Sequence, residues 1–187
     1  MTKINPELGY QHCLERVLIS EQELQTRIAE IAAQVSQDYA GKNLILICIL
    51  RGGVVFLSDL MRHITIPHQI DFMSVSSYGV GARSSSGSPR IVLDLNTDIR
   101  DRHVLLVEDI VDSGITLDYV LRILYTREPA SLNVCVLLDK EERRRVAIYP
   151  RYVGFKIPNE YVFGYGLDLD EVFRNLPFVG VLKAEYQ

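Results

Sequence analysis

The chain has 187 residues, of which 48% are hydrophobic and 24% are charged, a balance typical of one globular domain with a sizeable core. Its formal net charge of −4 at pH 7 argues against a generic nucleic-acid-binding protein, which needs a basic surface. The N-terminus is polar and the longest apolar run, residues 44–50, is short, so neither a secretory signal nor a membrane span is expected.

The first elements along the chain are predicted to be a helix and a buried strand. The pattern Ser20-Glu21-Gln22-Glu23 is that of a capping box at a helix start. Apolar residues then recur at helical spacing up to Tyr39, and Gly41 stands where a C′ glycine is expected. The continuous apolar run at residues 44–50 predicts a strand that is buried on both faces.

A glycine pair and a second helix follow this strand. Arg51-Gly52-Gly53 ends the apolar run, and the apolar positions between residues 54 and 61 predict a helix that ends before Pro67. A strand is predicted at residues 70–75. Residues 76–90 are rich in glycine and serine and have little to bury, so a long mobile loop is expected there, either a disordered hairpin tip or an active-site lid.

The second half of the chain repeats the alternation of strands and helices. An apolar strand is predicted at residues 103–107 and a helix at residues 116–126. The basic run Arg143-Arg144-Arg145 stands beside two glutamates and is interpreted as a solvated loop. Further strands are expected at residues 132–138, 161–165 and 179–182.

This alternation predicts an α/β fold with a mainly parallel sheet and helices on both of its faces. In such sheets, ligands bind beyond the carboxyl ends of the strands. Arg51, Glu108 and Lys140 all fall at predicted carboxyl ends. Cys13, Cys48 and Cys135 are odd in number and form no C-x-x-C pair, which favours a reducing, cytoplasmic compartment.

The segment Glu108-Asp109-Ile110-Val111-Asp112-Ser113-Gly114-Ile115-Thr116 carries the strongest chemical signal. Two carboxylates after a strand can hold vicinal hydroxyls or a hard cation. Small polar residues that open a helix offer backbone N–H groups and hydroxyls to a phosphate. One aspartate or serine here could simply cap the helix, but three acids within five residues need a further explanation. The segment therefore predicts a site for a sugar that carries a phosphate.

The same segment resembles the phosphoribosyl-pyrophosphate motif of the type I phosphoribosyltransferases, in the branch that acts on 6-oxopurines. Arg51-Gly52-Gly53 matches the family's pyrophosphate loop, and Ser77-Tyr78 resembles the start of its flexible catalytic loop. Residues 153–168 resemble its purine hood almost position for position. The resemblance runs from about residue 46 to residue 182. It implies the type I phosphoribosyltransferase fold, a twisted sheet with a small hood.

The resemblance implies roles for the residues around the sugar. Asp112 is expected to accept a proton from the purine as N9 attacks. Glu108 and Asp109 are expected to hold the ribose hydroxyls, directly or through Mg²⁺. The expected 5′-phosphate cradle consists of Ser113, Gly114, Ile115 and Thr116, where Ile115 contributes only its backbone.

The resemblance also implies a purine site and a pyrophosphate site. Lys140 is expected to donate to the O6 atom of the base, Tyr161 to stack on it, and Val162 to contact it through backbone groups. Asp168 is expected to serve a magnesium ion bound to pyrophosphate. Pyrophosphate itself is expected to contact Arg51, Gly52, Gly53 and Arg174, and substrate contacts are also expected at Ser77 and Tyr78.

The implied activity is the transfer of phosphoribosyl from phosphoribosyl pyrophosphate to N9 of hypoxanthine or guanine, in purine salvage. No nucleic acid or membrane is expected as a partner, and the family favours a homodimer or homotetramer. One domain is expected over residues 1–187, with a core at about 20–150. The N-terminal segment and about 151–187 are expected to form the hood.

Two alternatives stay open. A non-catalytic regulator that keeps the phosphoribosyl-pyrophosphate fold and binds RNA predicts a basic face, which the net charge does not suggest. The other alternative is a transferase for xanthine or a pyrimidine, and Lys140 and the hood of residues 161–168 favour a 6-oxopurine over a pyrimidine. Because guanine, hypoxanthine and xanthine differ only at the 2-position, the sequence does not determine the preferred 6-oxopurine.

Overall fold

The computed structural model describes residues 6–77 and 89–187 and contains a large and a small sheet. The strands of the large sheet, in spatial order, are β4 (Pro89–Leu93), β3 (His68–Ser77), β2 (Leu44–Leu50), β5 (His103–Val111), β6 (Ser131–Asp139) and β7 (Tyr152–Lys156). Those of the small sheet are β1 (Leu14–Ile19), β9 (Val179–Leu182) and β8 (Val162–Phe163). The helices are α1 (Glu21–Asp38), α2 (Gly53–His63) and α3 (Ile115–Tyr125), with short 3-10 helices at Pro6–Leu8, Tyr10–His12, Glu141–Arg143 and Ala184–Tyr186.

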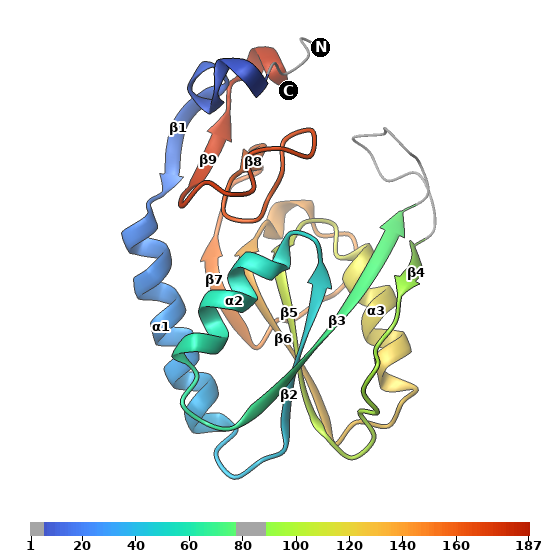
Figure 1. Ribbon diagram of the computed structural model, residues 1–187. Coiled ribbons are helices and arrows are strands. Elements are labelled where there is room, and N and C mark those ends of the chain that lie inside the picture. Colours follow the sequence, from blue (N-terminus) through green and yellow to red (C-terminus); the bar gives the residue numbers. More distant parts are fainter. Residues whose placement is uncertain (1–5, 78–88) are drawn as a thin grey trace.

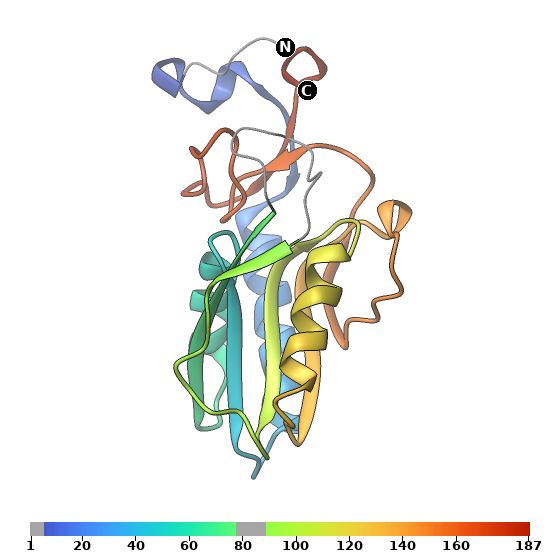
Figure 2. The same cartoon turned by 90° about the vertical axis from the view of Figure 1, so that its right-hand side faces the viewer.

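The large sheet is parallel except at one edge, as the alternation of elements predicted. Strands β3, β2, β5, β6 and β7 run parallel, and only β4 pairs antiparallel, with β3. Helices α1 and α2 cover one face and α3 covers the other (Figures 1 and 2). Among the described residues, no helix combines the length and apolar character that a membrane span requires.

Strand β2 shows why the run at residues 44–50 is apolar without interruption. Leu44, Leu46 and Cys48 lie in the core under α1 and α2, whereas Ile45 and Ile47 lie in the core under α3. Successive side chains of a strand point to opposite faces, so a strand between two helical layers must be apolar at every position. The prediction of a strand buried on both faces is confirmed.

Helix α1 begins as its sequence predicts. The Ser20 hydroxyl accepts a hydrogen bond from the Glu23 backbone N–H, and the Glu23 carboxylate accepts one from the Ser20 N–H, which completes the capping box. At the other end, Gly41 has a left-handed φ of 72°, but it is the second residue after the C-cap Tyr39 and not the first. The expected C′ position was wrong by one residue.

The loop predicted at residues 76–90 is shorter than expected. Ser76 pairs with Arg90, and Ser77 pairs with Pro89, so both ends of the segment belong to an antiparallel ladder. Val75 and Ile91 pack against the core under α3, and this tertiary contact outweighs the weak strand propensity of the serines. The prediction at Tyr78 and the rest of the loop falls on residues 78–88, which lie outside the described residues.

Strand β5 continues four residues beyond its predicted end at residue 107. Its ladder with β6 extends to Val111, opposite Asp139, because β6 is equally long. Glu108 and Asp109 are therefore strand residues, and their side chains leave opposite sides of the strand. The predicted strand end at residue 107 was therefore too early.

The small sheet stands above the carboxyl end of the large one, and both described ends of the chain lie beside it (Figure 1). Strand β9 has its predicted bounds, whereas β8 covers only Val162–Phe163 of the strand predicted at 161–165. Gly164 and Tyr165 have φ values of 92° and 50°, which end the extended backbone. Strand β7 belongs to the large sheet, so that sheet extends past the predicted boundary near residue 150.

Candidate functional site

A cleft of about 470 Å³ is lined by residues from the ends of β5 and β6, from β8 and from the segments that flank β8. This volume is within the range of small-molecule sites. The ends of β5 and β6 lie below the small sheet in Figure 1. The cleft brings together five predicted site residues, Asp112, Lys140, Tyr161, Val162 and Asp168. It is also lined by residues that were not predicted, namely Ile110, Arg143, Asn159, Glu160, Leu167 and Gln187.

Asp112 follows the last residue of β5, and its carboxylate forms an ion pair with an arginine. The Nε atom of Arg143 lies 2.9 Å from its Oδ1 atom. Arg143 belongs to the run interpreted as a solvated loop, and this interpretation holds only in part, because Arg143 and Arg145 are exposed whereas Arg144 is not. Arg144 of the same run is ion-paired with the buried Asp139 and donates to the carbonyl of Ile148. One feature of the sequence could have indicated these contacts, namely the position of the basic run shortly after the end of β6.

The segment from Ser113 to Thr116 forms the start of α3 beside the cleft and not in its lining. Gly114 is the N-cap with a φ of 82°, and a Cβ atom there would lie 3.1 Å from both Arg144 Cδ and Ile148 Cγ1. The left-handed φ therefore favours glycine at position 114, and the two close neighbours leave little room for a side chain. The first backbone N–H groups of an α-helix lack intrahelical acceptors, so this terminus can bind an anion.

Asp109 is buried against the glycine loop that follows β2. Its Oδ1 atom accepts a hydrogen bond from the Ile110 N–H at 2.8 Å. Burial raises the pKa of Asp109 to about 6, although backbone hydrogen bonds partly offset this effect. The neighbouring Glu108 has a buried Oε2 atom that finds no hydrogen-bond partner among the described residues. Burial and the charge of Asp109 raise the pKa of Glu108 well above its ordinary value.

These two carboxylates are poorly satisfied by the protein itself. Buried acids that lack cationic partners lose stability when they ionise, and they favour a ligand that supplies hydroxyl donors or a cation. Two residues of the segment after β8 also affect the pKa of Asp109: the charge of Arg174 lowers it and that of Asp168 raises it. Within residues 6–77 and 89–187, however, no three acidic, histidine or cysteine side chains come close enough together to hold a metal ion. Glu108, Asp109 and Asp168 therefore do not form a preassembled three-carboxylate centre.

Replacing Asp109 by asparagine is expected to stabilise the fold by about 1–3 kcal/mol at pH 8, since each unit of raised pKa costs about 1.4 kcal/mol. The folded pKa is about 6 and the ordinary value is 3.8, so the folded state takes up the proton first. The cost of the charge therefore grows as the pH rises through this window and is complete above it. Denaturant titrations at pH 5 and pH 8 check this, and a larger gain at pH 5 would contradict it.

The Arg51-Gly52-Gly53 loop meets the segment after β8 through an ion-pair network. Arg51 Nη1 lies 2.6 Å from Glu171 Oε2, and Arg174 Nη2 lies 2.8 Å from Asp168 Oδ1. The same Arg174 nitrogen is 3.4 Å from Glu171 Oε2. Both arginines predicted to face pyrophosphate thus converge on one place, although they are 123 positions apart. The Leu50–Arg51 peptide bond at this loop is cis.

Gly52 is tightly confined by its neighbours. A Cβ atom at this position would lie 1.6 Å from Asp109 Oδ2, so the carboxylate rests directly on the glycine. A Cβ atom on Gly166, whose φ is 96°, would lie 2.2 Å from the Gly52 carbonyl oxygen. The two glycines let the loop, strand β5 and the segment after β8 approach one another closely.

Replacing Gly52 by alanine is expected to destabilise the fold by about 1–3 kcal/mol, the usual cost of overpacking. The backbone of Gly52 is right-handed helical (φ −58°), so only the contact with Asp109 opposes a methyl group. The same substitution in an Asp109→Ala background should cost much less, because the clashing carboxylate is gone. Chemical denaturation of the four proteins checks this, and equal losses in both backgrounds would exclude the contact as the cause.

Lys140, at the end of β6, is buried, with 7% of its surface exposed. Its backbone N–H donates to the Val111 carbonyl at 2.9 Å, which ties the end of β6 to that of β5. No carboxylate of the described chain lies within ion-pair distance of its Nζ atom. Burial lowers the pKa of Lys140. Lys140 is therefore not a solvated surface charge, and a buried ammonium group that lines a cleft can donate to an oxygen of a ligand.

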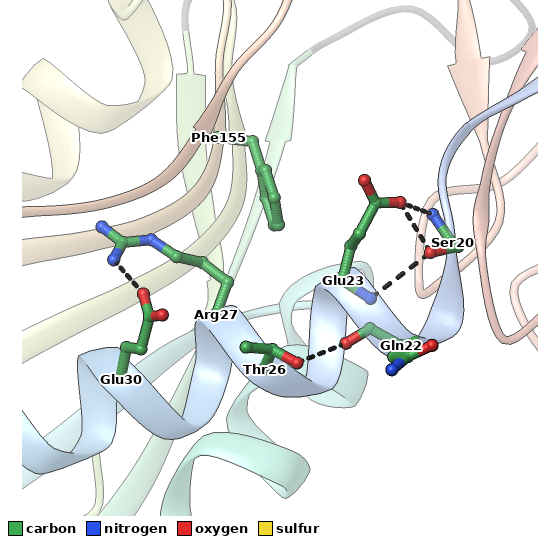
Figure 3. Close-up of a pocket in the computed structure, with 7 residues that line it drawn as sticks. All are labelled: Ser20, Gln22, Glu23, Thr26, Arg27, Glu30 and Phe155. Atoms are coloured by element: carbon green, nitrogen blue, oxygen red, sulfur yellow. Dashed lines mark hydrogen bonds and ion pairs between the residues drawn. The ribbon is translucent and has the colours of Figure 1, made fainter.

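A second hollow, of about 370 Å³, lies along the first half of α1 beside Phe155 (Figure 3). Its polar side chains already bind neighbours within the protein. Arg27 donates to the carbonyls of Val153 and Gly154 and pairs with Glu30, while Glu23 caps α1. These contacts fasten α1 to β7, and the hollow is best explained as a consequence of that packing.

Comparisons with known proteins agree with the geometry of the cleft. A family model described as the phosphoribosyl transferase domain matches residues 19–171. The chain is 46% identical over 188 residues to the hypoxanthine-guanine phosphoribosyltransferase of Mycobacterium avium, which covers 97% of this chain and 92% of that protein.

Solved structures are similar over nearly the whole chain. A hypoxanthine phosphoribosyltransferase from Staphylococcus aureus superposes with a TM-score of 0.89 at 43% identity and covers 98% of each chain. A variant of the hypoxanthine phosphoribosyltransferase from Trypanosoma cruzi, solved as a ternary substrates complex, superposes with a TM-score of 0.87 at 44% identity. It covers 94% of this chain and 98% of that one.

Proposed function

The chain belongs to the phosphoribosyltransferase domain family, and from this premise we infer that it is a hypoxanthine(-guanine) phosphoribosyltransferase of purine salvage. It transfers the phosphoribosyl group of phosphoribosyl pyrophosphate to N9 of a 6-oxopurine and releases pyrophosphate. The observation that carries this proposal is the cleft that is lined by Asp112, the buried Lys140, Tyr161 and Val162. These are the groups that a planar, oxygen-bearing base requires.

Each of these residues has a separate task in binding the base. Lys140 donates a charge-assisted hydrogen bond to O6, which selects a 6-oxopurine over an aminopurine. Tyr161 stacks on the ring, and the backbone of Val162 contacts the exocyclic edge. Asp112 accepts the ring proton as N9 attacks C1 of the ribose, so the purine reacts as a better nucleophile.

The sugar and its phosphate occupy the neighbouring start of α3. Ser113, Gly114, Ile115 and Thr116 offer the 5′-phosphate backbone N–H groups and two hydroxyls, supported by the helix dipole. Glu108 and Asp109 accept hydrogen bonds from the ribose hydroxyls, which satisfies the Glu108 Oε2 atom that finds no partner among the described residues. Fixing the ribose between these groups aligns C1 with the purine, and positioning supplies much of the rate enhancement.

Pyrophosphate leaves toward the loop after β2. Arg51 and Arg174 neutralise its charge, and the backbone of Gly52 and Gly53 allows close approach. The C1–O bond breaks with oxocarbenium character on the ribose, as in glycoside hydrolysis. Stabilising the leaving group therefore lowers the barrier directly. Ser77 and Tyr78 stay predictions of substrate contacts.

Magnesium fits the acidic residues of this site. The ion prefers oxygen ligands and is usually held by one or two carboxylates together with substrate phosphates. The charge of Asp168 contributes to the raised pKa of Asp109, and Glu108 has an oxygen atom that finds no hydrogen-bond partner among the described residues. When bound, Mg²⁺ neutralises the charge that develops on pyrophosphate. We place the protein in the cytoplasm as a homodimer or homotetramer, on the family resemblance.

Steady-state kinetics with phosphoribosyl pyrophosphate and hypoxanthine, guanine, xanthine or uracil tests the activity. We expect turnover with hypoxanthine, guanine or both, and kcat/KM at least about tenfold lower with uracil, which lacks the second ring. Turnover only with xanthine or uracil would replace the proposed substrate. Binding of phosphoribosyl pyrophosphate without turnover of any base would instead support a non-catalytic role.

A further inference from the structure

The segment that carries Asp168 and Arg174 is anchored to α2 by a buried tyrosine. The Tyr165 hydroxyl donates to the Oδ2 atom of Asp59 at 2.5 Å, and Gln25 Nε2 of α1 donates to the same oxygen at 2.9 Å. Tyr165 is 3% exposed, and its ring lies in the core under α1 and α2. The three side chains join two helices of the main body to the segment after β8.

This anchor lies close to both halves of the pyrophosphate site. Helix α2 begins at Gly53, so Asp59 and the glycine loop belong to one continuous piece of backbone. The neighbour of Tyr165 is Gly166, whose N–H donates to the Arg174 carbonyl and whose carbonyl accepts from Arg174 Nη1, both at 2.8 Å. A displacement of Tyr165 would therefore be passed directly to Arg174.

The chemistry of the contact makes it suitable for a fixed anchor. Burial and the hydrogen bond to Asp59 raise the pKa of Tyr165, so the phenol stays a donor over the whole working pH range. The Tyr165 backbone is itself held, because its N–H donates to the Leu176 carbonyl at 2.9 Å. The ring, the hydroxyl and the backbone of Tyr165 are all held by contacts, so the residue fixes the segment after β8 relative to α1 and α2.

We propose that Asp59, Tyr165 and Gln25 form a hood anchor, a set of positioning residues that sets the separation between Arg174 and the Arg51-Gly52-Gly53 loop. The inference rests on the proposed function. Because the anchor acts on the pyrophosphate half of the site, its loss should weaken binding of phosphoribosyl pyrophosphate and pyrophosphate. Recognition of the purine by Lys140 should be largely unaffected.

The chain offers a matched control for the test. The Tyr152 hydroxyl donates to Asp38 Oδ2 at 2.6 Å, and Tyr152 is 4% exposed. This second tyrosine–aspartate pair, in which the tyrosine is buried, joins the start of β7 to the end of α1, away from the carboxyl ends of the strands. Tyr165→Phe and Tyr152→Phe each remove one hydroxyl of the same kind, and both keep the aromatic ring.

We expect both variants to lose similar amounts of thermal stability. Only Tyr165→Phe should raise the KM for phosphoribosyl pyrophosphate and the Kd for pyrophosphate, by about tenfold, as for a lost hydrogen bond to a charged group. The KM for hypoxanthine at saturating phosphoribosyl pyrophosphate should change less than about twofold. Asp59→Asn keeps an acceptor for the phenol and should restore most of the affinity that Asp59→Ala loses. If Tyr165→Phe fails to fold, the comparison of Asp59→Asn with Asp59→Ala still tests the proposal.

Three results would overturn the proposed anchor. The KM for phosphoribosyl pyrophosphate could be unchanged in Tyr165→Phe, or the KM values for phosphoribosyl pyrophosphate and hypoxanthine could rise equally in that variant. The third result is an equal rise of the KM for phosphoribosyl pyrophosphate in Tyr152→Phe. Calorimetric binding of pyrophosphate keeps the test independent of turnover. If the wild-type protein transfers to no base but binds pyrophosphate, the proposed function fails while the anchor can still be measured.

Discussion

Replacing Asp112 by asparagine is expected to lower kcat by about two to four orders of magnitude, the span usual for loss of a general base. The side chain stands in the cleft directly after β5, and asparagine keeps its shape but cannot accept the purine proton. Its partner Arg143, at 2.9 Å, can still contact the amide oxygen, so the fold and the KM for phosphoribosyl pyrophosphate should change little. Steady-state and single-turnover kinetics measure the effect.

Asp118→Asn is the matched control for this substitution. Asp118 lies six residues further on, in α3, and its carboxylate pairs with Arg122 at 2.8 Å, outside the cleft. Both substitutions remove one charge from an aspartate–arginine pair, but only Asp112 is placed to meet the purine. A decrease in kcat smaller than about threefold for a folded Asp112→Asn protein would remove Asp112 as the general base.

Replacing Lys140 by methionine is expected to raise the KM for hypoxanthine and guanine by about tenfold to a hundredfold. A charge-assisted hydrogen bond to O6 contributes about 1.5–3 kcal/mol, which corresponds to that range of affinity. Methionine preserves the length and apolar volume of the buried stem, so the cleft should keep its shape. Affinity for phosphoribosyl pyrophosphate should be nearly unchanged, because Lys140 stands on the base side of the cleft.

The control is Lys156→Met, at the end of the adjacent strand β7. Lys156 is exposed and pairs with Glu141 at 2.6 Å, so its loss should change neither affinity. Separate titrations of the base and of phosphoribosyl pyrophosphate distinguish the variants. An unchanged base affinity in Lys140→Met, or equal losses for both ligands, would place Lys140 outside the purine site.

Predictions from the sequence were accurate where neighbouring residues determine the structure. The bounds of β2 and β9, the capping box at Ser20 and the helix after Gly53 all follow from patterns within one contiguous segment. Capping, helical periodicity and uninterrupted burial are local effects, so a single stretch of sequence contains the information. The family motifs added roles for site residues, and kinetics of the kind described above must test these roles.

Strand lengths and strand partners depended on the tertiary structure. Half of the residues of β1 are exposed, and the segment forms a strand because β9, more than 150 positions away, offers a backbone to pair with. Strand β5 continues through Glu108 and Asp109 because β6 is long enough to pair with them. Hydrogen bonds between distant backbones carry no signature in either segment alone.

The sequence by itself determined the alternating α/β architecture, the motif at the end of β5 and the lysine after β6. Only the tertiary structure revealed that Arg143 faces Asp112, that the Asp109 carboxylate rests on Gly52, and that Tyr165 donates to Asp59. Each of these contacts joins residues more than 30 positions apart. Their geometry arises when the parallel strands bring their carboxyl ends to one edge and the small sheet closes over it, because only then do distant side chains come within hydrogen-bonding distance.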